Sequence, residues 1–255
     1  MTAIFITGTG TDVGKTFVAV SLIGHLRRMG CPVDAVKPVV SGFDPAQPMA
    51  SDPGELLRAL GGPVTTDALN RISPWRFHAA LSPDLAAQRE GRSIDVDQVI
   101  VFCQSAIKQS QDILLIEGVG GVMTPLDAQR TILDVMMALR LPHILVAGSY
   151  LGTISHTLTA LDSLYRRELE VMAIIVSETA GSSVPLDDTV AAIARFAGPV
   201  IGLPRTRPDV GAGTNLGRLF GWHPRRPARG ADEAEATPTA RPSGPERNDL
   251  LRERS

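Results

Sequence analysis

The residues best suited to chemistry lie near the start of the chain, in the segment GTGTDVGKT at positions 8–16. Its glycines let backbone N–H groups converge on an anion, and Lys15 adds a positive charge beside the outer phosphates of a nucleotide. The hydroxyl of Thr16 is the kind of oxygen that holds Mg²⁺ in such a loop. The segment therefore predicts a phosphate-binding loop, although Thr9 stands where the motif usually opens with glycine. An ordinary glycine-rich turn is the alternative.

The elements around this loop have the order that phosphate binding requires. A short apolar run at 4–6 precedes it, and a segment with helical apolar spacing follows it from Thr16 to Met29. The amino end of that helix points its free N–H groups and its positive dipole end at the same anion. A dinucleotide-binding turn is disfavoured, because Val13 follows where a third glycine is needed.

A second basic residue is expected at the same edge of the sheet. Residues 32–36 form a predicted strand, and KPVVSG follows at 37–42. The carboxyl ends of parallel strands line the ligand crevice of an open α/β sheet, so Lys37 and Ser41 should reach the phosphate loop. A buried lysine is costly unless it meets an anion. A surface lysine before a turn is the alternative.

Two acidic residues are candidates for a magnesium site. The apolar run at 113–116 is typical of a central parallel strand, and it ends in Glu117-Gly118-Val119-Gly120-Gly121. An acid at such a strand end is the usual partner of Mg²⁺ in phosphate-loop enzymes. Asp52 either caps a predicted helix at 52–60 or supplies a further carboxylate.

The second half of the chain repeats the alternation of strand and helix. A strand at 143–147 leads into GSYLGTISH at 148–156 and a helix that ends near Tyr165. A turn of this composition at a helix amino end is a second anion site, suited to a substrate carboxylate. Further elements are a strand at 171–176 that ends at Ser177-Glu178, a helix at 187–196, and a strand at 199–203 before Pro204-Arg205-Thr206.

The pattern as a whole predicts an α/β fold with a mostly parallel central sheet and helices on both faces, of the phosphate-loop NTPase type. Residues 43–51 are expected to form a loop, and 63–81 an irregular segment on the substrate side. Residues 1–206 form the predicted single domain. The pattern assigns nothing to 207–224, and the composition of 225–255 predicts a disordered tail.

Composition excludes several classes of function. The formal net charge is −2, so nothing points to nucleic acid as a partner. Cys31 and Cys103 form no metal-ligand spacing and no disulfide framework. We find neither a signal peptide nor an apolar run long enough to span a membrane. These features predict a soluble, cytoplasmic protein without membrane contact.

Taken together, the motifs resemble those of the dethiobiotin synthetases of biotin biosynthesis. The resemblance extends in order over roughly residues 2–206 and rests on GTGTDVGKT, KPVVSG, ASD at 50–52, IEGVGG at 116–121 and LGTISH at 151–156. It implies an ATP- and Mg²⁺-dependent ligase that closes the ureido ring of dethiobiotin from 7,8-diaminononanoate and CO₂. The intermediates would be a carbamate and a carbamic–phosphoric anhydride. It also implies a homodimer.

The resemblance carries roles to individual residues. Lys15 and Lys37 would be catalytic cations, and Thr16, Asp52 and Glu117 would hold Mg²⁺. Substrate would contact Thr11 and Ser41 and, across the dimer interface, the turn of Leu151, Gly152 and Thr153. ATP would contact Asp12, Val13, Gly14, Lys15, Thr16, Phe17, Asp52, Glu117, Gly118, Val119, Gly120, Ser177, Glu178, Pro204, Arg205 and Thr206.

Two departures and two alternatives accompany this assignment. Asp12 stands where the family usually has glutamate, and Ser177-Glu178 where an Asn-Asp pair commonly reads adenine. A related amidoligase of the cobyrinic acid type would need a glutaminase domain with a nucleophilic cysteine. A partitioning-type ATPase switch would need a second lysine where Gly10 stands.

Overall fold

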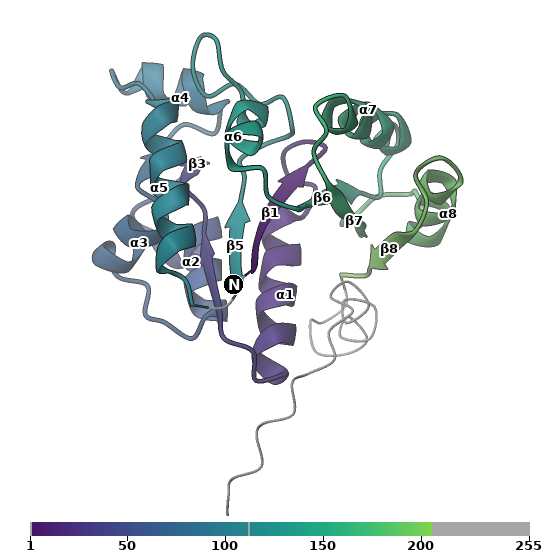
Figure 1. Ribbon diagram of the computed structural model, residues 1–255, viewed down its shortest axis with the longest axis horizontal. Coiled ribbons are helices and arrows are strands. Elements are labelled where there is room, and N and C mark those ends of the chain that lie inside the picture. The colour runs from purple at the N-terminus through teal and green to yellow at the C-terminus, as the bar shows by residue number, and fades with distance from the viewer. Residues whose placement is uncertain (1, 112, 206–255) are drawn as a thin grey trace, which may run out of the picture. The chain divides into compact units, whose positions relative to one another are not determined.

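The computed structural model describes residues 2–111 and 113–205, and its main element is a six-stranded parallel sheet (Figure 1). The strand order is β2-β5-β1-β6-β7-β8. Helices cover both faces of the sheet, which confirms the predicted fold class. The strands are β1 (Thr2–Gly8), β2 (Val33–Val36), β5 (Ile113–Glu117), β6 (His143–Gly148), β7 (Val171–Ser177) and β8 (Val200–Leu203).

The helices follow the strands as the apolar spacing predicts. They are α1 (Lys15–Arg28), α2 (Asp52–Ala59), α3 (Thr66–Ile72), α4 (Pro83–Arg89), α5 (Val96–Gln109), α6 (Ile132–Leu139), α7 (Thr153–Tyr165) and α8 (Leu186–Ala197). A 3₁₀ turn, η1, covers Pro48–Ala50 inside the expected loop. Gly30 has a φ of 71°, the left-handed backbone expected after the end of α1.

The core strands are buried along their length, and their register sets the site. All five residues of β5 and the last six of β1 are buried, as continuous apolar runs covered on both faces require. Ile6 of β1 pairs with Glu117 of β5, and Val36 of β2 pairs with Ile116. Lys37 therefore follows β2 directly beside Glu117, at the carboxyl edge of the sheet.

The prediction of an irregular segment at 63–81 was wrong. Helix α3 occupies its first half, where the Thr65 hydroxyl accepts a hydrogen bond from the Ala68 N–H at 3.2 Å. Strand β4 (Trp75–Phe77) then pairs in parallel with β3 (Val39–Ser41). Strands this short lack a periodicity that a sequence could reveal, and only the pairing over a long sequence separation defines them.

Of the two roles considered for Asp52, that of helix cap was wrong. Ser51 is the N-cap of α2, and its hydroxyl accepts a hydrogen bond from the Gly54 N–H at 3.3 Å. Asp52 is the first helical residue, so its carboxylate is available to the site rather than to the backbone.

The predictions for 207–224 and for the tail at 225–255 lie outside the described residues, and so does the boundary set at 206. Among the helices that are described, none has both the length and the apolar character needed to cross a membrane.

The buried His143 should make the free energy of unfolding depend on pH. Its Nδ1–H donates to the Glu170 carbonyl at 3.0 Å, its ring is fully buried, and burial lowers its pKa below 6.5. The unfolded chain therefore takes up a proton near pH 6.5 that the folded chain excludes. We expect the free energy of unfolding to fall between pH 6.5 and 5, by at most about 1.4 kcal/mol per pH unit from this group.

Urea unfolding at pH 7 and pH 5 measures this loss. His143→Phe should reduce the difference between the free energies of unfolding at the two pH values. An identical pH dependence in wild type and His143→Phe would contradict the assignment.

Candidate active site

The phosphate loop connects β1 to α1 and is closed by its own lysine. Lys15 Nζ donates a hydrogen bond to the Gly10 carbonyl at 2.7 Å. Asp12 and Gly14 have φ values of 57° and 94°, so the loop turns through two left-handed residues. Gly14 is the N-cap of α1 and offers no capping side chain, which leaves the amino end of the helix facing the loop. This is the geometry of an anion site.

Gly14 is required at its position for a second reason. A Cβ atom there would lie 2.4 Å from Ser177 Oγ at the end of β7. Ser177 is 2 % exposed, so it cannot withdraw without a shift of the strand. The predicted nucleotide residues 14 and 177 are therefore in direct contact.

The segment after β5 supports the loop from behind. The Val122 N–H donates to the Gly8 carbonyl at 3.1 Å, and the Gly118 N–H donates to the Ile6 carbonyl at 2.9 Å. A Cβ atom on Gly121 would lie 3.1 Å from the Thr9 carbonyl oxygen, so a larger residue would require the two segments to move apart by a few tenths of an ångström. The sequence indicated the glycines but did not reveal Val122, because its contribution is a backbone hydrogen bond.

Lys37 is held between two carboxylates. Its Nζ lies 2.5 Å from Glu117 Oε1 and 2.8 Å from Asp52 Oδ2. Lys37 is 2 % exposed and Glu117 is 1 % exposed. Burial alone would lower the pKa of Lys37, but the charges of Glu117 and Asp52 outweigh it and raise the pKa above 10.5. Lys37 is therefore a fixed cation.

The same arrangement shifts the pKa values of Asp52 and Lys15. Burial alone would raise the pKa of Asp52, but Lys37 holds it below 3.8. Burial and then the charge of Lys37 lower the pKa of Lys15 to about 8. The ammonium groups of Lys15 and Lys37 therefore repel each other, and a bound anion would reduce this repulsion.

Three oxygen-bearing side chains meet at this point and suit a magnesium ion. The Thr16 hydroxyl donates to Glu117 Oε1 at 2.7 Å, and Asp52 reaches the same ammonium group as Glu117. The second oxygen, Glu117 Oε2, is buried and has no hydrogen-bond partner among the described residues. Mg²⁺ takes such hard oxygen ligands. The part of the chain that is described holds no group of three or more His, Cys, Asp or Glu arranged for a metal, so phosphates would complete the set.

The remaining residues predicted to contact ATP or substrate differ in their exposure. Thr11 and Asp12 are exposed on the phosphate loop, and Val13 is buried beneath it. Phe17 is half-buried in the first turn of α1, and Ser41 is half-buried at the end of β3, which pairs with β4 in a sheet separate from the central one.

The residues predicted to read the base lie beside Ser177. Glu178 Oε2 accepts a hydrogen bond from the Arg205 N–H at 2.9 Å, so this carboxylate fixes the segment after β8. Pro204 and Arg205 are exposed there, and Thr206 lies outside the described residues. The sequence did not predict the contact between Glu178 and Arg205.

The turn before α7 is held by internal hydrogen bonds. The Thr153 hydroxyl donates to the Gly148 carbonyl at 2.7 Å and its N–H donates to the Tyr150 carbonyl at 3.1 Å, so both donors of Thr153 are engaged within the turn. Gly152 is the N-cap with a φ of 97°, and Leu151 is 92 % exposed. The Tyr150 hydroxyl and His156 Nδ1 lie 2.9 Å apart, so these two side chains are hydrogen-bonded across the turn.

The chain is similar to known proteins over most of its length. A family model described as an AAA domain, AAA_26, matches residues 2–210. The ATP-dependent dethiobiotin synthetase BioD of Methylobacterium nodulans is 47% identical over 203 residues, which cover 78% of this chain and 90% of the relative. The BioD of Caulobacter sp. strain K31 is 49% identical over 197 residues, covering 77% and 84%.

The chain belongs to the dethiobiotin synthetase family. Among solved structures, this family member is similar to the septum site-determining protein MinD of Pyrococcus horikoshii, with a TM-score of 0.51 and 16% identity. That match covers 86% of this chain and 93% of MinD. At this identity the likeness shows a shared fold alone.

The contact between Gly14 and Ser177 is testable by stability. Gly14→Ala adds a Cβ atom at an unfavourable φ and against a buried side chain, so we expect a loss of about 1–3 kcal/mol in the free energy of unfolding. Gly10→Ala is the matched control, because its Cβ atom would meet only Val13 Cγ1 at 3.9 Å. Equal losses in the two variants, measured by urea unfolding, would contradict the close packing described here.

Proposed function

We propose that this chain closes the ureido ring of dethiobiotin from 7,8-diaminononanoate and CO₂, with ATP as co-substrate. The observation that carries the proposal is the position of Lys37. It is a buried, charged ammonium group at the end of β2, and β5 lies between β2 and the strand that leads into the phosphate loop. ATP binding by itself needs the loop amides and Lys15, so a second fixed cation fits a reaction that brings two anions together.

The first step is the uptake of CO₂ by one amine of the substrate, which loses a proton and becomes a carbamate. Thr11 is exposed on the phosphate loop, and Ser41 lies at the end of β3, in the small separate sheet of β3 and β4 that follows Lys37 in the chain. Their hydroxyl groups are proposed to hydrogen-bond to the carbamate and to the adjacent amine. This orients a carbamate oxygen toward the γ-phosphate.

The second step transfers the γ-phosphoryl group to that oxygen and releases ADP. Lys15 and Lys37 would stabilise the charge that spreads over the phosphoryl oxygens, because both ammonium groups are already in place before the reaction. Thr16, Asp52 and Glu117 would hold Mg²⁺, which neutralises phosphate charge when it is bound. The second amine then attacks the carbamic–phosphoric anhydride, and phosphate leaves as the ring closes.

The far end of the substrate is proposed to reach a second copy of the chain. The turn at 151–156 presents an exposed Leu151 and a partly exposed Ile154, with exposed fractions of 92 % and 37 %. Apolar side chains exposed beside a helix amino end support a homodimer in which this turn meets the substrate carboxylate.

The two alternatives lack comparable support. Neither cysteine is a candidate nucleophile, because Cys103 is buried with its pKa raised to about 12 and Cys31 precedes β2, at the opposite end of the strand from Lys37. The likeness to MinD concerns the fold, and Gly10 stands where a partitioning ATPase needs lysine.

The role of Lys37 separates the synthetase from a nucleotide switch. Lys37→Gln should cut turnover by roughly a hundredfold or more, the scale for losing one preorganised electrostatic donor. ATP affinity measured without substrate should weaken less in Lys37→Gln than in Lys15→Gln, because only Lys15 belongs to the phosphate loop. Circular dichroism checks that both variants are folded, since Lys37→Gln removes the cation that pairs with the buried Glu117 carboxylate.

Equal losses of ATP affinity in the two variants, with normal binding of the diamine to both, would contradict this role. Lys37 would then be a nucleotide ligand only, and the substrate assignment would lose its main support.

The pair Ser177-Glu178 leads to a prediction about the base. Ser177 is buried against Gly14 and Glu178 is bonded to the Arg205 N–H, so no side-chain amide is offered to adenine. We expect ATP, GTP and CTP to support turnover within roughly tenfold of one another, because a missing hydrogen-bond partner costs selectivity. Rates at saturating diamine measure this. A strong preference for ATP would mean that backbone groups near 204–206 read the base.

A further inference from the structure

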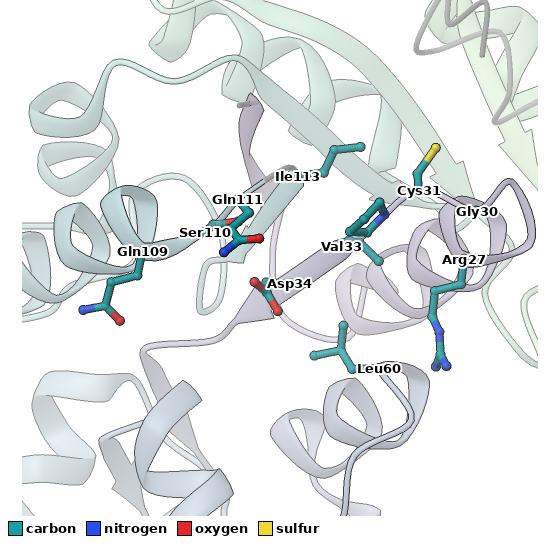
Figure 2. A pocket seen from close by; sticks show the side chains of 11 residues that line it. Arg27, Gly30, Cys31, Val33, Asp34, Leu60, Gln109, Ser110, Gln111 and Ile113 are labelled. Carbon is teal, nitrogen blue, oxygen red and sulfur yellow. The ribbon is translucent and has the colours of Figure 1, made fainter. Parts of the chain in front are cut away.

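A cavity of about 600 Å³ lies at the opposite edge of the sheet from the phosphate loop (Figure 2). Its lining comes from the end of α1, the start of β2, the end of α2 and the segment between α5 and β5. All of these contribute at the amino ends of the strands, so the cavity plays no part in the reaction proposed above. Its volume is within the range of ligand sites.

The polar groups of the lining include a cation, an anion and a neutral amide. Arg27 supplies an exposed guanidinium group that donates one hydrogen bond to the Ala59 carbonyl, at 2.6 Å, and keeps its other donors. Asp34 supplies a carboxylate and Gln111 an amide, and Figure 2 shows both between Gln109 and Arg27 in its view. Such a set can bind a carboxylate at one end and N–H or carbonyl groups in the middle.

Ser110 shows that the lining is not saturated with internal bonds. It is 8 % exposed, and its hydroxyl has no hydrogen-bond partner in the described part of the chain. A buried polar group without a partner is unfavourable, and a ligand with a donor or acceptor would relieve this. Val33, Leu60 and Ile113 provide apolar lining for an aliphatic chain.

We propose that this cavity is a second ligand site for a small carboxylate that carries a urea group on a short aliphatic chain. Arg27 binds the carboxylate, Asp34 and Gln111 bind the urea, and the apolar residues cover the chain. The inference rests on the proposed function, because dethiobiotin, its product, belongs to this chemical class. Product would thus bind at both edges of the sheet.

The cavity lies at the far ends of the elements that carry the site. Strand β2 runs from Val33 toward Lys37, β5 runs from Ile113 to Glu117, and α1 begins at Lys15 and ends near the cavity. An occupant would therefore contact three elements whose other ends hold the reacting groups.

Cys31 allows occupancy of the cavity to be measured apart from the active site. It is a partly exposed thiol in the lining, and the chain has one other cysteine, the fully buried Cys103. The experiment follows alkylation of Cys31 in the full chain by iodoacetamide, with mass spectrometry of the peptides, and uses dethiobiotin as the probe. We expect labelling to slow roughly tenfold when free dethiobiotin is about ten times its dissociation constant. Nonanoate, which lacks the urea, should protect less.

Three variants locate the effect. Gln111→Ala should weaken protection, whereas Gln104→Ala, an exposed glutamine of α5 outside the lining, should not. Ser41→Ala, at the proposed substrate site, should keep protection. Absence of protection in the wild type, equal protection in Gln111→Ala, or loss of protection in Ser41→Ala would overturn the inference.

A turnover assay with ATP, diamine and bicarbonate keeps the two proposals apart. Turnover without protection of Cys31 would overturn this site and leave the proposed function in place. Protection without turnover would support the site while removing the proposed function.

Discussion

The structure depends on one ion-paired contact, the ammonium group of Lys37 between Glu117 and Asp52. Glu117 and Lys37 are almost fully buried, so each charge is stable there only because the other is present. Removing one partner of such a pair typically costs about 3–5 kcal/mol. The two side chains meet because β2 and β5 pair in parallel and end together, and Asp52 arrives from α2 once Ser51 has taken over the capping role. The sheet register is therefore also the register of the site.

The phosphate loop is shaped by close backbone packing as much as by charge. Gly14 meets Ser177 from β7, and Gly121 meets the carbonyl of Thr9 from the segment after β5. These contacts bring the ends of three strands around the loop without any side chain of the loop itself. Lys15 closes the loop on Gly10, so that its charge is directed before a nucleotide arrives.

The strong periodic signals of the sequence predicted most of the fold. Long apolar strands and amphipathic helices were found at their places, because burial on both faces of a parallel sheet leaves a clear pattern. Strand β4 and helix α3 were not predicted. A strand of three residues is defined by its partner and not by its own composition, and a helix of seven residues is too short to show a clear apolar period. The sequence did not identify the N-cap of α2 for a related reason. Ser51 and Asp52 are both residue types that cap helices well, and only the path of the backbone decides between them.

The residues of the site were likewise predictable only where the sequence carries a clear pattern. Charged residues at strand ends were identifiable, because Lys37 and Glu117 stand out after apolar runs. The sequence could not reveal backbone hydrogen bonds, such as that from the Val122 N–H to the Gly8 carbonyl. Nor could it reveal which polar side chains are already hydrogen-bonded within the protein, as the Thr153 hydroxyl is to the Gly148 carbonyl. The cavity at the amino edge of the sheet was equally hidden, because its lining joins residues from four separate segments.

The most direct test of the account is the dependence of phosphate release on both small substrates. Purified protein is given Mg²⁺ and ATP, with 7,8-diaminononanoate and bicarbonate added singly and together, and phosphate and dethiobiotin are both quantified. The account predicts that phosphate release requires the two together and that one dethiobiotin forms for each phosphate. Phosphate release at the same rate without the diamine, or without any dethiobiotin, would contradict it.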